Sequence, residues 1–251
     1  MPEVVAQPEA SAASLSQVQR VVDTFVAPSK TFTDILRSAS WWIPWLIGVI
    51  VTLGLGFAIQ QKIGWDKTYD NILRQQSVAQ QQKMEQMPAD QQARVKAIGT
   101  NFVKMVFWAT PVLAIVFAAI AAGVLLASLN FGVGGRASYG KMFAVWMYGA
   151  LPWSIQGLLG IITIYAGVDP DSFNLNNFVG TNIGYYLPPD TAKWLLVLGQ
   201  SIDIFTIWVL ILLTIGCAIV GKVKRGQAAG VVWGWWILIT LVKVGFAAIR
   251  S

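Results

Sequence analysis

Residues 194–221, WLLVLGQSIDIFTIWVLILLTIGCAIVG, form an apolar stretch in which Asp203 is the single formal charge. A helix of about 28 residues measures about 42 Å, which exceeds the ~30 Å hydrocarbon layer of a bilayer. The stretch therefore predicts a membrane-spanning helix that tilts or projects. It also raises the question of what a carboxylate does inside such a helix.

The overall composition gives the same class. Of 251 residues, 55% are hydrophobic and only 12% are charged, whereas soluble domains carry about 25% charged residues. The chain also has 12 Trp and 23 Gly. Long apolar runs rich in these two residues are typical of helical membrane proteins. We therefore expect an integral membrane protein.

Five stretches are long and apolar enough to span a bilayer. They predict an all-α, polytopic membrane helix bundle, preceded by a disordered N-terminal tail at residues 1–16. Residues 17–250 then form one five-span membrane domain. The predicted spans are residues 41–60, 105–129, 142–166, 194–220 and 230–249. Gly230 and Gly234 form a GxxxG pattern, for which packing within the chain is the default interpretation.

Two segments outside the spans have helical patterns. Residues 17–40 are amphipathic, and a helix there either lies in the membrane interface or packs against the bundle. Residues 64–104, the first loop, are rich in Gln and helical in composition. They form either a solvated helical hairpin, an extension of the spans, or a surface for a partner.

The short loops predict the orientation. Arg136 and Lys141 follow the second span, and Lys222, Lys224 and Arg225 follow the fourth, in both cases without an acid. The positive-inside rule places both loops in the cytoplasm, with the N-terminus inside and the C-terminus outside. One feature disagrees with this orientation: the whole connection between the first two spans, residues 61–104, is then outside although it carries seven Lys or Arg against four acids. Long loops count less in this rule.

Lys243 in the fifth span is the natural partner for Asp203. Measured from the turn between the last two spans, the two residues lie at depths that differ by about one helical turn. We expect them to face each other, or to share a polar cluster with Gln200, Ser201 and Thr206. Three roles remain open: a structural ion pair, a titrating or ion-binding site on a translocation path, and independent snorkelling to the outer interface.

The composition also excludes several kinds of catalytic and metal-binding chemistry. The chain has no His, so imidazole catalysis and His-ligated metals are ruled out. Its one cysteine, Cys217, lies in an apolar run and is expected to pack rather than react. We therefore expect no enzyme activity, no cofactor and no bound metal. The net charge of +6 points to anionic lipid headgroups rather than nucleic acid.

Three stretches resemble the Yip family, the Ypt/Rab-interacting membrane proteins, and more closely its bacterial branch. They are RVVDTFVAPSKTFTDILRSASWWIPWL (20–46), GGRASYGKMFAVWMYGALPW (134–153) and DIFTIWVLILLTIGCAIVGKVKRGQA (203–228). The resemblance implies five spans and a cytoplasmic N-terminus. Eukaryotic members bind Rab-type GTPases, an activity that does not transfer to a bacterial chain with a short tail. The family has no catalytic motif to map.

These observations lead to a functional hypothesis. We expect a non-enzymatic scaffold or adaptor in the bacterial inner membrane, with the lipid bilayer, other membrane proteins or a second copy of the chain as partners. The alternative is a small channel or transporter subunit that uses Asp203 and Lys243. The two differ in whether water reaches Asp203.

Overall fold

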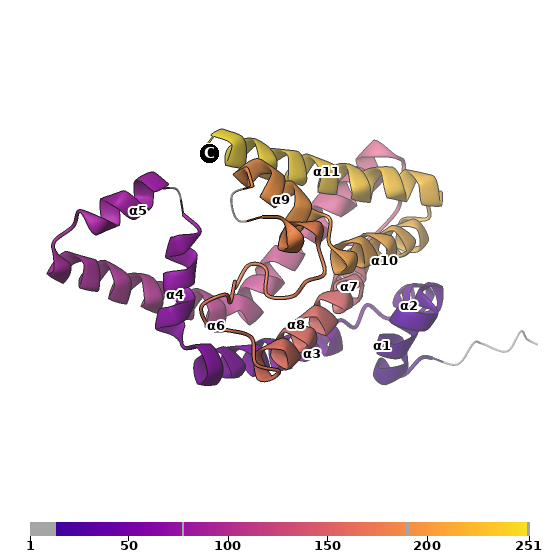
Figure 1. Ribbon diagram of the computed structural model, residues 1–251. Helices are drawn as coiled ribbons and strands as arrows, with labels where there is room; N and C mark the ends of the chain where they lie inside the picture. The colour runs from indigo at the N-terminus through magenta and orange to yellow at the C-terminus, as the bar shows by residue number, and fades with distance from the viewer. Residues whose placement is uncertain (1–13, 77, 189–190, 250–251) are drawn as a thin grey trace, which may run out of the picture.

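The structure, a computed structural model, describes residues 14–76, 78–188 and 191–249, and over these ranges it contains helices but no β-strand (Figure 1). The predicted all-α fold is confirmed. The helical elements are α1 (Gln17–Val26), α2 (Pro28–Ile35), α3 (Trp42–Ala58), η1 (Ile59–Ile63), α4 (Trp65–Arg74), α5 (Val78–Glu85), α6 (Ala89–Ala127), η2 (Ser128–Gly132), α7 (Tyr139–Gly149), α8 (Leu151–Tyr165), η3 (Ile183–Tyr186), α9 (Lys193–Ser201), α10 (Ile204–Gly221) and α11 (Arg225–Ile249).

Five helical segments are long and apolar enough to cross a membrane, as predicted. They are Trp42–Ile63, Ala89–Gly132, Tyr139–Tyr165, Ile204–Gly221 and Arg225–Ile249. The predicted bounds of the fourth span were wrong, because residues 194–220 are divided between α9 and α10. Most of the predicted disordered tail, residues 1–13, lies outside the described residues.

Glycines let α7 and α10 approach closely in the core. A Cβ on Gly149 would lie 2.7 Å from Leu213, and one on Gly216 would lie 2.6 Å from Val145. By contrast, a Cβ on Gly230 or Gly234 would meet nothing within 4 Å. The GxxxG pattern of α11 therefore faces outward, and its predicted packing within the chain was wrong.

The N-terminal hairpin, α1 with α2, packs beside the bundle. Ser16 caps α1 in a capping box with Gln19, and Pro28 occupies the first turn of α2, where its missing N–H leaves no bond unmade. Phe32 and Ile35 of α2 are fully buried. A Cβ on Gly216 of α10 would lie 2.9 Å from the Phe32 ring. Residues 17–40 were expected either to lie in the membrane interface or to pack against the bundle. Helix α2 packs against the bundle.

The first loop is helical, as predicted, and packs at the end of the bundle away from the N-terminal hairpin. Asn71 of α4 donates hydrogen bonds to the carbonyls of Pro170 (2.8 Å) and Phe173 (2.7 Å) in the loop after α8. Salt bridges pair three of the first loop's cations with acids. These pairs are Lys67–Asp171, Arg74–Asp171 and Lys96–Asp70. Of these two acids, only Asp171 comes from another loop, so the pairs offset little of the excess of cations that disagreed with the positive-inside rule.

Candidate functional site

Asp203 lies at a break between two helices. α9 ends at Ser201, and α10 begins at Ile204 with Asp203 as its N-cap. The Oδ1 atom of Asp203 accepts hydrogen bonds from the backbone N–H groups of Phe205 (2.8 Å) and Thr206 (3.1 Å). The carboxylate thus satisfies two of the donors that every helix start leaves free, and its charge complements the positive end of the helix dipole.

The second carboxylate oxygen is held by residues distant in sequence. Thr181 donates its hydroxyl to Oδ2 at 2.5 Å, and Gln156 of α8 donates its side-chain amide at 3.2 Å. The backbone N–H of Ile204 also donates to the carbonyl of Thr181 at 3.1 Å. Asp203 is only 4% exposed. Irregular backbone inside a membrane protein requires this kind of internal satisfaction, which the loop before η3 supplies here.

The predicted pairing of Asp203 with Lys243 was wrong. Both residues are described, yet no ion pair joins them, and Lys243 is exposed on α11. The physical reason is the helix break. As an N-cap, the carboxylate must turn toward the N–H groups of its own helix, and its remaining oxygen meets α8 and the preceding loop instead of α11.

The other members of the predicted polar cluster have separate roles. Thr206 does contact Asp203, but through its backbone N–H. The hydroxyl of Ser201 donates to the carbonyl of Val197 within α9 at 2.8 Å. Gln200 is half-buried, and its backbone lies against Gly184 of η3. The structure brings in Gln156 and Thr181, which the sequence analysis missed. A side-chain amide in an otherwise apolar span could have identified Gln156 as a polar partner. No sequence feature identified Thr181.

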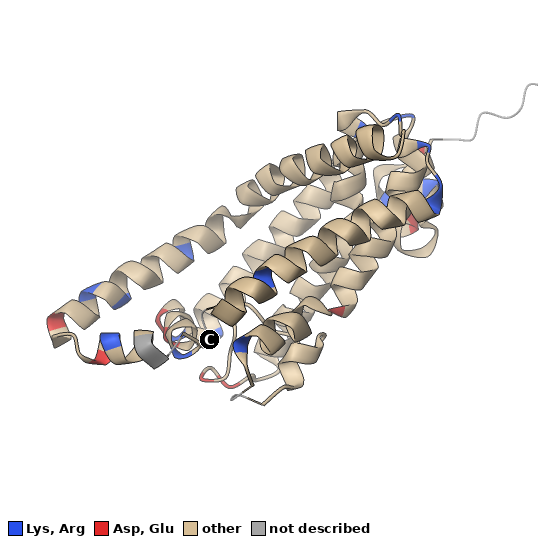
Figure 2. Cartoon of the chain, turned by 90° about the horizontal axis from the view of Figure 1, so that it is seen from above, with Lys and Arg blue, Asp and Glu red and all other residues tan. Residues whose placement is uncertain are grey.

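The two short basic loops carry Arg136, Lys141, Lys222, Lys224 and Arg225 and join α6 to α7 and α10 to α11 at the other end of the spans, where Figure 2 shows Lys and Arg gathered. We call this group the basic end. The two loops are joined because the backbone N–H of Arg136 donates to the carbonyl of Gly221 at 3.0 Å. None of the five cations forms a salt bridge with any residue that the structure describes. They therefore present unneutralised positive charge.

A buried ion pair holds the N-terminal hairpin together. The Arg20 guanidinium donates to Asp34 Oδ2 at 2.6 Å and to the carbonyl of Ser38 at 2.9 Å. Arg37 donates to the other oxygen of Asp34 at 2.8 Å. Burial by itself raises the pKa of the Asp34 carboxyl, but the hydrogen bonds and charges of Arg37 and Arg20 outweigh it, so this pKa lies below its ordinary value.

The comparison with known families agrees with this architecture. The sequence profile described as the Yip1 domain matches residues 22–246, which include all but the edges of the structure just described. The chain belongs to the Yip1 family. This family is a membrane-protein family and not a family of enzymes. No curated protein and no solved structure matches the chain.

Proposed function

We propose that this Yip1-family chain is a non-enzymatic scaffold or adaptor that holds partner proteins at a membrane surface. The proposal includes a place in the bacterial branch of the family and in the bacterial inner membrane. The N-terminal hairpin and the basic end would face the cytoplasm, and the end of α11 would face outside. The two short loops that carry five Lys or Arg and no acid support this orientation.

One observation carries the proposal: exposed charge and exposed apolar surface lie together at one end of the bundle. Val18, Val22 and Val26 are 69%, 53% and 74% exposed, and their spacing places them on one face of α1. The hairpin that carries them packs on α10, with Phe32 against Gly216 and Phe25 against Trp208, and it lies at the same end of the bundle as the turn between α10 and α11 (Figure 1). An apolar stripe next to unpaired cations suits an acidic protein segment or an anionic lipid headgroup.

The alternative, a channel or transporter subunit, receives less support from the contacts of Asp203. Both carboxylate oxygens accept two hydrogen bonds each, so the group has no free acceptor direction for a passing ion. A Thr206→Cys variant, made after Cys217→Ala, tests this. We expect protection from membrane-impermeant thiol reagents, and rapid labelling from outside would favour the alternative.

The scaffold proposal is tested by co-purification from native membranes. Replacement of Lys222, Lys224 and Arg225 by Gln should remove most partner proteins, because it deletes three unpaired cations at the basic end. The matched control replaces three cations between residues 61 and 104, Lys62, Lys83 and Arg94, by Gln and should keep the partners. Equal recovery from both triple variants would contradict the proposal.

A further inference from the structure

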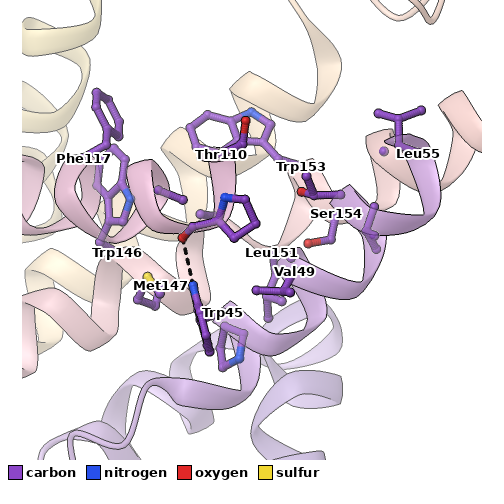
Figure 3. A pocket seen from close by; sticks show the side chains of 18 of the residues that line it. Trp45, Val49, Leu55, Thr110, Phe117, Trp146, Met147, Leu151, Trp153 and Ser154 are labelled. Carbon is purple, nitrogen blue, oxygen red and sulfur yellow. Dashed lines mark hydrogen bonds between the residues drawn. The ribbon is translucent and has the colours of Figure 1, made fainter. Parts of the chain in front are cut away.

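A cavity of about 310 Å³ lies between α3, α6, α7 and α8 (Figure 3). All four helices belong to candidate membrane spans. Its lining is almost wholly apolar and includes the rings of Trp45, Phe117, Trp146 and Trp153. Figure 3 shows these rings around the hollow, with Leu55 of α3 toward one end. The cavity is unrelated to Asp203, which does not line it.

The few polar groups of the cavity wall give water little to bind. The indole of Trp45 donates to the carbonyl of Pro111 at 3.0 Å, and the hydroxyl of Thr110 donates to the carbonyl of Val106 at 3.3 Å. The hydroxyls of Thr52 and Ser154 are the other polar side-chain groups of the wall. An ordered water needs two to four polar partners, whereas apolar cavities stay dry. An apolar occupant is therefore favoured.

The rim of the cavity belongs to the surface that the spans present to lipid. Ala114, Phe117 and Trp153 line the cavity and are themselves exposed. Phe117 lies near the middle of the apolar part of α6. Exposed side chains at that depth contact hydrocarbon tails, since no water is present there. The cavity is thus continuous with the protein–lipid interface.

We propose that this cavity binds one acyl chain of a bilayer phospholipid. The side chains that line an empty cavity of this size lack dispersion contacts on one side. A neighbouring lipid tail would supply these contacts without desolvating any polar group. The bilayer supplies that tail at very high local concentration. This inference does not depend on the scaffold proposal, because it concerns the spans and not the basic end.

Gly48 offers a direct test, because it lines the cavity and a Cβ added there meets nothing within 4 Å. A Gly48→Leu side chain therefore enters the empty space without a clash at its Cβ. Gly230→Leu is the matched control, since its Cβ is equally free but lies on α11 outside the cavity. Both variants add the same side chain to a membrane helix.

The measurement is native mass spectrometry of the full chain purified in mild detergent, counting phospholipid molecules retained per chain. We expect wild type and Gly230→Leu to retain one phospholipid, and Gly48→Leu to show about tenfold lower occupancy, since a lost set of dispersion contacts of about 1.4 kcal/mol has that effect. Circular dichroism checks that each variant keeps its helices. If Gly48→Leu misfolds, Ser154→Leu fills the same cavity from α8.

Four results overturn the proposal. The first is a wild-type chain without retained phospholipid, and the second is equal retention in the cavity-filling and control variants. The third is rapid labelling of a Ser154→Cys variant, made after Cys217→Ala, by a water-soluble thiol reagent, because the cavity would then be hydrated. A retained molecule with a mass other than that of a phospholipid also rejects the proposed occupant.

Discussion

Asp34 is partly buried and Asp203 is buried, and the two carboxylates are satisfied in different ways. Asp34, outside the spans, is held by the guanidinium groups of Arg20 and Arg37. Asp203, at the start of α10, is held by two backbone N–H groups, a hydroxyl and an amide, and by no cation among the described residues. Both are well satisfied, but only one forms an ion pair.

The difference follows from what each carboxylate is near. A helix N-terminus already presents a row of N–H donors and a positive dipole end, so a carboxylate placed there needs no counter-ion. Asp34 lies within the short helix α2, away from such free donors, and arginine side chains supply its hydrogen bonds instead. An acid in an apolar run therefore does not require a basic partner when it also starts a helix.

Loss of the Arg20 guanidinium should have the largest effect. Arg20→Met leaves Asp34 largely buried with one cation fewer, and breaking a buried ion pair costs about 3–5 kcal/mol. We expect the N-terminal hairpin to detach, measured as faster limited proteolysis within residues 14–40 and a lower thermal midpoint in detergent. Arg37→Met, at the exposed partner of the same acid, should change stability by less than about 1 kcal/mol. Equal losses of stability in the two variants would show that the burial of Arg20 does not make its ion pair the stronger one.

Asp203→Ala should come next. It removes the cap of α10 and leaves the Thr181 hydroxyl and the Gln156 amide without their acceptor, for an expected loss of about 2–4 kcal/mol in unfolding free energy. Asp203→Asn keeps a capping oxygen and should lose less than half as much. Thermal unfolding in detergent gives both values. If Asn is as damaging as Ala, the negative charge itself is required, and the neutral-donor account of this site fails.

Lowering the pH should destabilise the N-terminal hairpin at Asp34. The pKa of Asp34 is lowered in the folded chain, so the stability from its ion pairs is present above its ordinary value of 3.8 and is lost as the pH falls below that value. The effect should be smaller than that of Arg20→Met, because Arg20 still donates to the Ser38 carbonyl. Proteolysis of the hairpin between pH 5 and about pH 3 measures it. An Asp34→Asn variant should show no such transition.

Changes at Lys243 should have the smallest effect. Lys243→Gln on the exposed side of α11 should alter stability by less than about 0.5 kcal/mol, as for other surface positions. The double reversal Asp203→Lys with Lys243→Asp should be as unstable as Asp203→Lys alone, since no ion pair exists to restore. Rescue by the second change, measured by thermal unfolding, would reinstate the pairing and end the contrast with Asp34.

The spans were predictable from sequence, whereas the partners of their polar residues were not. The five apolar stretches gave the number of spans and most of their bounds. The break at Asp203 had a local signal, because Ser, Asp and Asn are common N-cap residues and the apolar stretch exceeds the bilayer thickness. The formal charges of Asp203 and Lys243, the one cation in the adjacent span, instead favoured an ion pair between them.

Hydropathy is a sum of local transfer free energies, so the amino-acid sequence by itself determined the membrane class, the five spans and the basic loops. The tertiary structure decided which distant groups reach a given side chain. Thr181 meets Asp203 because the loop before η3 folds back over the start of α10, and Gln156 meets it because α8 packs against α10. The α3–α6–α7–α8 cavity exists only where four helices pack incompletely. Neither contact nor void is encoded at a fixed sequence spacing, because each depends on the path of the whole chain.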